Sequence, residues 1–309
     1  MSTTDTRRPL DGQAVGLMLL LCLIWSLQQI LLKATAQDFS PTLQLALRSG
    51  IAAVLVWLYM RFKGERLTLA RGIWQPGLLV GVLFALEFVM VGQAVRYTTA
   101  GHVVVFLYSA PVFAALGLHL KLPEERLEPL QWLGIALAFG GIAVAFLGQA
   151  AQSQGQTSAL GDALALGGAL AWGLTTVAIR TTALSSLPAT QTLLYQLAVG
   201  FVLLGIASVW MGQTTFHSSW PVWASLAFNA VAVCFFSFLV WFSLLRTYLA
   251  SRLGVFSFLT PILGVVLGAW LLDEPVEPNF ALGALLVLAG IVLVSGYRWL
   301  VRYLPARKS

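Results

Sequence analysis

The sequence contains little charge. Charged residues make up 10% of its 309 positions and hydrophobic residues 59%, whereas a soluble domain has about 25% charged and about 45–50% apolar residues. This composition excludes an ordinary soluble domain and indicates an integral membrane protein. The net charge of +6 is compatible with nucleic-acid binding, but the positions of the basic residues, described below, explain it without such a partner.

Residues for covalent or metal chemistry are also scarce. Cys22 and Cys234 both lie within apolar runs, which argues against a disulfide framework and against a CxxC metal site. The three histidines are dispersed near the ends of apolar runs, and no Ser/His/Asp arrangement or intramembrane Asp pair is readable. We therefore expect no enzymatic activity, no metal site and no cofactor.

Long apolar runs dominate the sequence. A helix needs about 20 apolar residues to cross about 30 Å of hydrocarbon, and ten runs of roughly this length are present. The first run is too long for a signal-peptide core and has no small-residue cleavage site, so it is expected to be an uncleaved span. The expected spans are residues 13–34, 42–62, 75–95, 99–119, 130–148, 160–180, 189–211, 221–244, 251–272 and 279–299.

The two halves of the chain repeat each other. A loop-like stretch at 148–158 separates the fifth span from the sixth, so the expected repeats are residues 1–150 and 151–309. Each repeat has five spans, an odd number, so the second repeat enters the membrane in the opposite orientation. The matched positions are Trp25, Lys33 and Pro41 with Trp172, Arg180 and Pro188, Pro111 and Glu124 with Pro261 and Glu274, and Gly134 and Gly141 with Gly283 and Gly290.

Basic residues indicate how this arrangement is oriented. With both termini in the cytoplasm, all Lys and Arg residues except Lys33, Arg48 and Arg96 lie on the cytoplasmic side, as the positive-inside rule requires. Inverted repeats are a recurring plan of secondary transporters, which hold substrate near the midplane between the halves. The sequence thus predicts an all-α membrane protein of ten helices, built as two inverted five-helix repeats around a central cavity.

Prolines and tryptophans near the membrane midplane are the first candidates for functional positions. Pro111 and Pro261 lie near the middle of spans four and nine, where a proline removes a backbone hydrogen bond. We expect a kink that lines a cavity or acts as a hinge, although prolines are in any case commoner in membrane helices. Trp25 and Trp172 lie mid-span and are expected to face the cavity, whereas Trp241 lies near an inner end.

These motifs resemble those of the drug/metabolite transporter superfamily, in particular its ten-span exporters built from two five-span repeats. The resemblance rests on the tryptophan motifs IWS (24–26) and AWG (171–173) and on the proline-then-acid pattern of spans four and nine. The chain looks most like the bacterial aromatic amino acid exporters of that group. This likeness implies export of aromatic and other neutral amino acids across the inner membrane. The first span contains no acid, unlike the first span of the four-span multidrug branch.

Charged side chains within the hydrocarbon are costly and usually face the protein interior. Arg48 lies within span two, Glu87 within span three, and Lys33 at the outer end of span one. One reading places Lys33 or Arg48 at a substrate carboxylate, and Glu87 at its ammonium group or as a proton carrier. The other is structural, with Glu87 and Arg48 forming an ion pair and Lys33 extending to the interface.

Further polar residues near the midplane are candidates for substrate contact, although helix-to-helix hydrogen bonding explains each of them equally well. They are Gln28, Tyr108, Thr176, Tyr195 and Gln196. The expected partners are amino acids and the lipid bilayer, with a monomer sufficient. Export of another small metabolite (a sugar phosphate, nucleotide sugar or drug) and a channel-like facilitator remain alternatives, as do proton antiport and facilitated diffusion.

Overall fold

The computed structural model describes residues 8, 10–98, 100–152, 159–272, 276 and 279–295. Within these ranges the chain is helical, and nine helices are long and apolar enough to cross a membrane. A tenth apolar helix, Asn279–Val294, is shorter within the described residues. The predicted all-helical membrane fold is confirmed, and its ten expected spans agree with these elements.

The first half contains five spans, the fourth of which is split in two. A short 3-10 turn, η1 (Pro123–Glu125), follows that split span. The helices are α1 (Gly12–Thr35), α2 (Pro41–Phe62), α3 (Arg71–Tyr97), α4 (Ala100–Leu107), α5 (Ala110–Lys121) and α6 (Pro129–Gln152).

The second half follows the same plan, except that its third span contains nine residues of π-helix, η3 (Asn229–Ser237). Span eight, expected at 221–244, thus consists of α9 (Trp220–Phe228), η3 and α10 (Phe238–Thr247). The 3-10 turn η2 (Ala183–Ser186) connects the first two spans. The other helices are α7 (Ala159–Thr181), α8 (Ala189–Trp210), α11 (Ala250–Phe256), α12 (Leu259–Leu272) and α13 (Asn279–Ser295).

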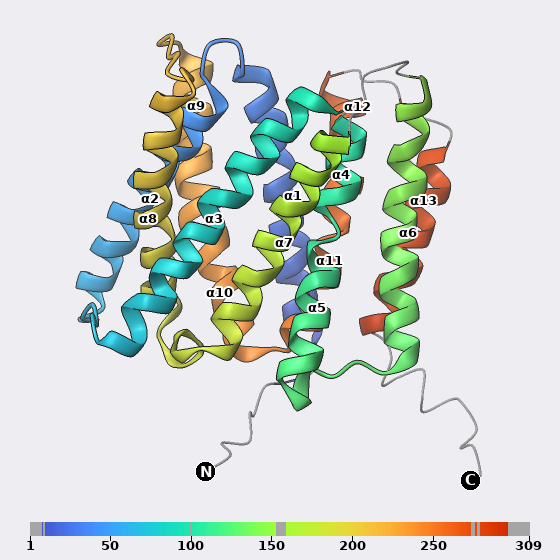
Figure 1. Cartoon of the computed structure of the whole chain (residues 1–309), viewed down its shortest axis with the longest axis horizontal. Coiled ribbons are helices and arrows are strands. Elements are labelled where there is room, and N and C mark those ends of the chain that lie inside the picture. Colours follow the sequence, from blue (N-terminus) through green and yellow to red (C-terminus); the bar gives the residue numbers. More distant parts are fainter. Residues whose placement is uncertain are drawn as a thin grey trace.

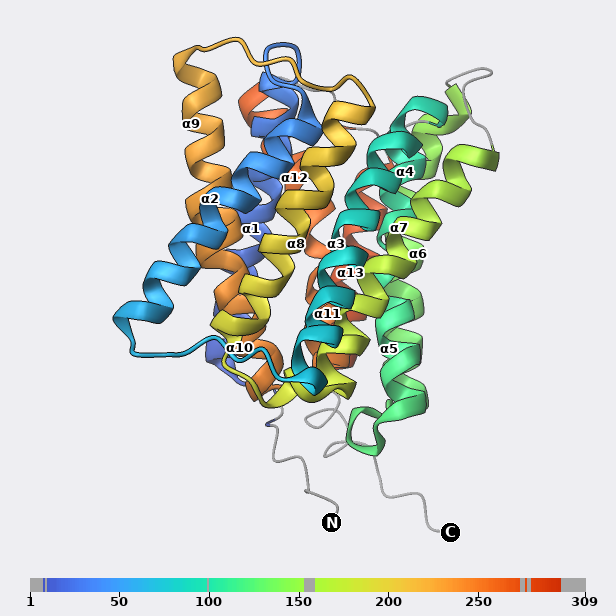
Figure 2. The same cartoon turned by 60° about the vertical axis from the view of Figure 1, so that its left-hand side comes forward.

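Successive spans run up and down the bundle, so its described part begins and ends at the same end. This lower end in Figure 1, where α1 begins and α13 ends, is called the terminal face here, and the upper end the opposite face. Helix α1 rises from the terminal face, whereas α7 descends toward it (Figure 1). Figure 2 shows the same alternation from another side.

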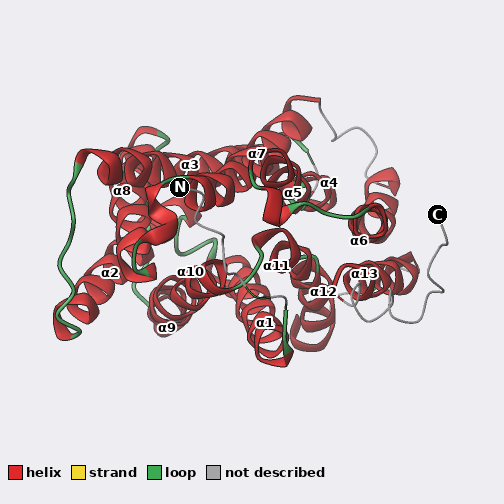
Figure 3. Cartoon of the chain, turned by 90° about the horizontal axis from the view of Figure 1, so that it is seen from below, coloured by secondary structure: helices red, strands yellow, loops and turns green. Residues whose placement is uncertain are grey.

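The two halves interlock rather than lie side by side. Seen from below, α8, α3 and α7 form one row, α10, α1 and α12 lie across from them, and α6 pairs with α13 at one end (Figure 3). Helix α1 packs against α12 and α7 packs against α5. The first span of each half therefore contacts the split span of the other half.

Glycines allow close contact between α3 and its neighbours. A Cβ atom at Gly81 would lie 2.4 Å from Cβ of Val199 on α8, and one at Gly168 on α7 would lie 3.3 Å from the carbonyl oxygen of Glu87. Small residues let membrane helices approach closely and gain van der Waals contact. This packing fixes α3, and with it Glu87, against the second half.

Candidate transport site

The split spans break immediately before the two prolines singled out in the sequence. Helix α4 ends at Leu107 and α5 begins at Ala110, with Pro111 as its second residue. Helix α11 ends at Phe256 and α12 begins at Leu259, two residues before Pro261. Both breaks agree with the loss of the N–H group that a helix interior needs at each proline, and the role of the two prolines as hinges stays a prediction.

A serine hydroxyl forms an equivalent hydrogen bond to the backbone at each break. The hydroxyl of Ser109 donates to the carbonyl oxygen of Phe106 at 2.6 Å, and that of Ser257 donates to the carbonyl oxygen of Gly254, also at 2.6 Å. Serine hydroxyls commonly satisfy backbone groups that a membrane helix frees at a break. The pairing marks Ser109 and Ser257 as matching positions that the sequence comparison missed.

The break in span nine receives further hydrogen bonds from α1. The thiol of Cys22 donates to the carbonyl oxygen of Phe256 at 3.2 Å. The hydroxyl of Ser26 lies 2.8 Å from the carbonyl oxygen of Thr260 and 2.7 Å from that of Cys22. Side chains of the first half thus stabilise the interrupted backbone of the second.

At the break in span four, close packing against the backbone of α7 takes the place of these hydrogen bonds. Gly173 of α7 takes the place that Ser26 has on α1, and a Cβ atom there would lie 3.1 Å from the carbonyl oxygen of Ala110 and 2.8 Å from Cβ of Phe113. The difference between the motifs IWS and AWG is therefore structural. Ser26 forms a hydrogen bond to the backbone near the break in span nine. Gly173 has no side chain, and this lets the break in span four pack closely against α7.

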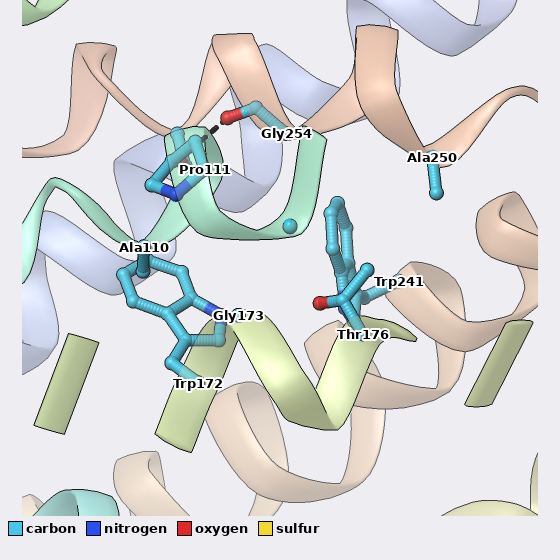
Figure 4. A pocket seen from close by; sticks show the side chains of 10 residues that line it. Ala110, Pro111, Trp172, Gly173, Thr176, Trp241, Ala250 and Gly254 are labelled. Carbon is cyan, nitrogen blue, oxygen red and sulfur yellow. Dashed lines mark hydrogen bonds between the residues drawn. The ribbon is translucent and has the colours of Figure 1, made fainter. Parts of the chain in front are cut away.

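A small pocket lies between the two breaks. Pro111 and Gly254 line one side of it, and Trp172, Thr176 and Trp241 line the other (Figure 4). Its volume of about 20 Å³ leaves room for roughly one water molecule, whereas ligand pockets measure about 300–1,000 Å³. This pocket is too small for a substrate in this conformation.

Aromatic side chains surround this pocket. The ring centroids of Tyr108 and Trp172 lie 5.8 Å apart at an interplanar angle of 82°, and those of Trp25 and Trp241 lie 5.9 Å apart at 76°. The indole N–H of Trp25 donates to the hydroxyl of Ser237 at 2.9 Å. Trp241, which the sequence placed near an inner end, packs inside the bundle. The sequence missed this because the position of a residue along a helix does not tell which way its side chain faces.

Arg48 is completely buried on α2. Its Nη1 donates to Oδ1 of Asn229 at 3.0 Å, and its guanidinium lies 5.2 Å from the ring centroid of Phe88. Among the described residues no ion pair joins Arg48 to Glu87, although the two charges lie close enough to attract each other. The ion pair considered from the sequence is therefore absent, and Asn229 is the partner that sequence reasoning missed.

The remaining polar candidates are scattered. Gln28 and Gln196 are buried on α1 and α8. Lys33 is exposed at the end of α1, away from the pocket-lining residues. The hydroxyl of Tyr195 donates to the carbonyl oxygen of Thr68 at 2.5 Å. Tyr195 thus holds the connection between α2 and α3, outside the pocket between the breaks.

A larger cavity of about 610 Å³ opens toward the terminal face between α1, α2, α8 and α10. Its lining includes the basic residues Arg8, Lys63 and Arg246 and the acidic residue Glu65. The ammonium group of Lys63 lies 4.9 Å from the ring centroid of Tyr59, whose hydroxyl raises the pKa of Lys63. The cavity is large enough for a small molecule, and basic residues outnumber acidic ones in its lining.

A buried ionic network joins η1, α7 and α11 near the terminal face. The guanidinium of Arg180, at the end of α7, binds Oε1 of Glu125 with Nε at 3.0 Å and Nη2 at 2.6 Å. The same carboxylate accepts the backbone N–H groups of Ala250 and Ser251, at 2.9 and 3.0 Å, and the Ser251 hydroxyl at 2.6 Å. The sequence had placed Arg180 on the cytoplasmic side and had singled out Glu124. Arg180 is buried, and its partner is Glu125, the neighbour of Glu124. Glu274, which the repeat matches to Glu124, lies outside the described residues.

Matching hydrogen bonds fasten the halves at the two faces. At the terminal face Asp11, which caps α1, accepts the hydroxyl of Tyr248 at 2.8 Å. The pKa of Asp11 is lowered mainly by the hydrogen bond from the N–H of Ala14 and next by the one from this hydroxyl. The same bond to Asp11 raises the pKa of Tyr248. At the opposite face Asp162 of α7 accepts from the hydroxyl of Thr98 at 2.9 Å and lies 2.9 Å from Nδ1 of His102.

Comparison with known proteins identifies the architecture. Residues 13–147 and residues 159–296 each match the sequence profile of the EamA-like transporter family. A solved crystal structure superposes with a TM-score of 0.77 over 95% of this chain and 99% of its own, at 20% sequence identity. That likeness shows the fold.

Relatives with similar sequences carry transporter names. The chain is 29% identical to the uncharacterized transporter YvbV of Bacillus subtilis, with 90% of both chains covered. It is 26% identical to a probable amino-acid metabolite efflux pump of Escherichia coli over 92% of this chain and 95% of the relative. A pump of the same name from Salmonella typhimurium is also 26% identical, over 91% of this chain and 95% of the relative.

Proposed function

The chain belongs to the EamA-like transporter family, and from this membership we propose that it exports aromatic and other neutral amino acids across the bacterial inner membrane by alternating access. It is a multi-pass membrane transporter and not an enzyme. The names of its enterobacterial relatives support amino-acid metabolites as the substrate class. The basic residues at the cytoplasmic ends of the spans support an orientation with both termini in the cytoplasm.

The aromatic pocket between the two helix breaks is the observation that carries this proposal. Trp172 and Trp241 line it, and Tyr108 and Trp25 make edge-to-face contacts with these two side chains. Widening of the pocket by movement at the breaks would create an aromatic surface suited to an aromatic side chain. We assign Thr176, Gln28 and Gln196 to polar contacts in the open state, and residues 1–150 and 151–309 to the two inverted repeats.

The charged candidates keep distinct roles in this proposal. Arg48 binds the substrate carboxylate, and Glu87 lies near its ammonium group or carries protons. Lys33, exposed at the end of α1, and Tyr195, bonded to Thr68, contribute to the route between site and surface. Glu87→Gln tests the proton role, since it should abolish accumulation driven by a pH gradient and leave downhill exchange in place.

Counterflow in proteoliposomes tests the substrate class. Labelled phenylalanine should exchange against internal phenylalanine faster than alanine does, and sugar phosphates should not exchange. Trp172→Ala should weaken phenylalanine transport by about tenfold, because an aromatic contact contributes up to about 1.5 kcal/mol beyond its buried area. Trp210→Ala, at an 87% exposed position, is the matched control.

Several outcomes would contradict the proposal. Exchange of sugar phosphates without amino acids would give the chain another substrate class. Downhill flux without counterflow would indicate a channel-like pore. An equal loss for phenylalanine and alanine in Trp172→Ala would assign that tryptophan to folding or gating.

The prolines give a separate prediction about movement. Pro111→Ala and Pro261→Ala each restore a backbone N–H, and a restored hydrogen bond of about 1 kcal/mol should slow opening about fivefold. We expect both variants to bind substrate normally, to exchange it slowly and to label with cysteine reagents mainly from one side. Pro76→Ala, inside the uninterrupted α3, is the control. Normal exchange in both break variants would show that the prolines are packing features.

A further inference from the structure

The guanidinium of Arg48 has one occupied edge and one open edge. Its Nη1 donates to Oδ1 of Asn229, but Nε and Nη2 have no hydrogen-bond partner although the side chain is completely buried. Buried donors are nearly always paired, so two unpaired ones on a single charged group call for an explanation. Two unpaired donors on one buried charged group are suited to a ligand that enters the bundle during transport.

The open edge has the geometry of a carboxylate receptor. The Nε–H and Nη2–H bonds of an arginine run parallel along the same side of its plane, and two parallel donors match the two oxygens of a carboxylate. Asn229 is itself held, because its Nδ2 donates to the carbonyl oxygen of Ser225 at 2.9 Å. With Phe88 beside the guanidinium, the plane of Arg48 is fixed and its open edge is preorganised.

An unpaired acceptor lies one helical turn away. Gln44 and Arg48 are four residues apart on α2 and so lie on the same face of the helix. The amide of Gln44 donates from Nε2 to the hydroxyl of Ser225 at 2.6 Å, and its Oε1, also buried, has no partner. Two open donors and one open acceptor on the same helix face complement a carboxylate with a neighbouring ammonium group.

We propose that the Nε–Nη2 edge of Arg48 binds the α-carboxylate of the transported substrate and that Oε1 of Gln44 accepts a hydrogen bond from its α-ammonium group. This inference rests on the proposed function and specifies its substrate class as a zwitterionic α-amino acid. A zwitterion suits these groups, because its carboxylate matches the two donors of Arg48 and its ammonium group matches the acceptor of Gln44. A phosphate ester would bring roughly two negative charges to the single guanidinium of Arg48, and Lys33 does not line the pocket between the breaks.

The π-helix connects this receptor to the aromatic pocket. Asn229 is the first residue of η3 and bonds Arg48, whereas Ser237 is its last residue and bonds Trp25. Segments of π-helix occur frequently at functional sites. The carboxylate receptor and the aromatic wall are therefore positioned by the two ends of one element, which makes Asn229 a positioning residue.

Competition with labelled phenylalanine in proteoliposomes tests the assignment. For the unaltered protein, phenylalaninamide, which lacks the carboxylate, and 3-phenylpropionate, which lacks the ammonium group, should each compete at least tenfold less well than phenylalanine. Arg48→Gln should lose at least tenfold in phenylalanine affinity and no longer distinguish phenylalanine from its amide. Gln44→Leu should lose the discrimination against 3-phenylpropionate. Arg96→Gln, at an exposed position of α3, is the control and should behave as the parent.

Each outcome decides the assignment. Equal competition by phenylalanine and its amide on the unaltered protein overturns it, whether or not Arg48→Gln folds. If no amino acid exchanges but 3-phenylpropionate binds in an Arg48-dependent manner, the carboxylate receptor stands and the proposed function fails. If amino acids exchange and Arg48→Gln keeps the discrimination, the proposed function stands and this inference fails. Competition by inorganic phosphate or glucose 6-phosphate, without any by carboxylates, overturns both.

Discussion

Glu125→Ala should destabilise the folded transporter by about 3–5 kcal/mol, because removing one partner of a buried ion pair leaves the other charge uncompensated. The substitution strands Arg180 in a buried environment. It also removes the acceptor of the N–H groups of Ala250 and Ser251 at the start of α11. Thermal unfolding in detergent, followed by size-exclusion chromatography, measures the loss.

Glu124 provides the matched control for this change. It neighbours Glu125 in η1 but is exposed, so Glu124→Ala should change the unfolding free energy by no more than about 0.5 kcal/mol. Replacing both charges, as in Glu125→Leu with Arg180→Met, should recover part of the loss, since an apolar pair of similar volume often substitutes for a buried ion pair. Equal melting of Glu124→Ala and Glu125→Ala would show that the network contributes nothing.

Gly290→Ala should destabilise the α6–α13 pair by about 3 kcal/mol, the upper end for overpacking. A Cβ atom at Gly290 would lie 2.3 Å from the carbonyl oxygen of Gly134 and 2.7 Å from the backbone nitrogen of Ala138. Because both neighbours are backbone atoms, no side chain can turn aside to make room, and the helices must separate. Thermal unfolding measures this loss as well.

Gly140 is the control on the same helix pair. A Cβ atom there meets nothing within 4 Å, so Gly140→Ala should be neutral or stabilise the protein by about 0.5–1 kcal/mol through better helix propensity. Opposite signs for Gly290→Ala and Gly140→Ala would support close backbone packing. If both substitutions are tolerated equally, the helix pair does not depend on its glycine contacts.

Much of the fold could be predicted because the signals that carry it are local. Apolar length located the spans, and proline chemistry located the breaks in spans four and nine. The glycines matched between the repeats proved to be contact points, with Gly134 against Gly290 and Gly141 against Gly283.

The parts of the candidate site that were missed depend on long-range contacts. Arg48 and Asn229 are 181 residues apart, and a lone asparagine in an apolar run does not identify its partner. Glu124 and Glu125 are adjacent, so without the conformation of η1 no sequence argument decides which acid turns inward. The π-helix η3 has no apolar period that distinguishes it from an ordinary membrane helix.

The crosswise packing of the halves constrains how the protein is made. Synthesis and membrane insertion deliver the first half before α7 and α11 exist, so Glu125 emerges before Arg180 and Ser251 can reach it. The contact between Gly173 and the break before Pro111 likewise cannot form until α7 has been made. The hydrogen bond from Ser26 to Thr260 cannot form until α12 has been made. We therefore expect the first five spans to remain a loose intermediate, held by the insertion machinery until the second half arrives. The inner contacts of the transporter would then form late and together, as the last step of its biogenesis.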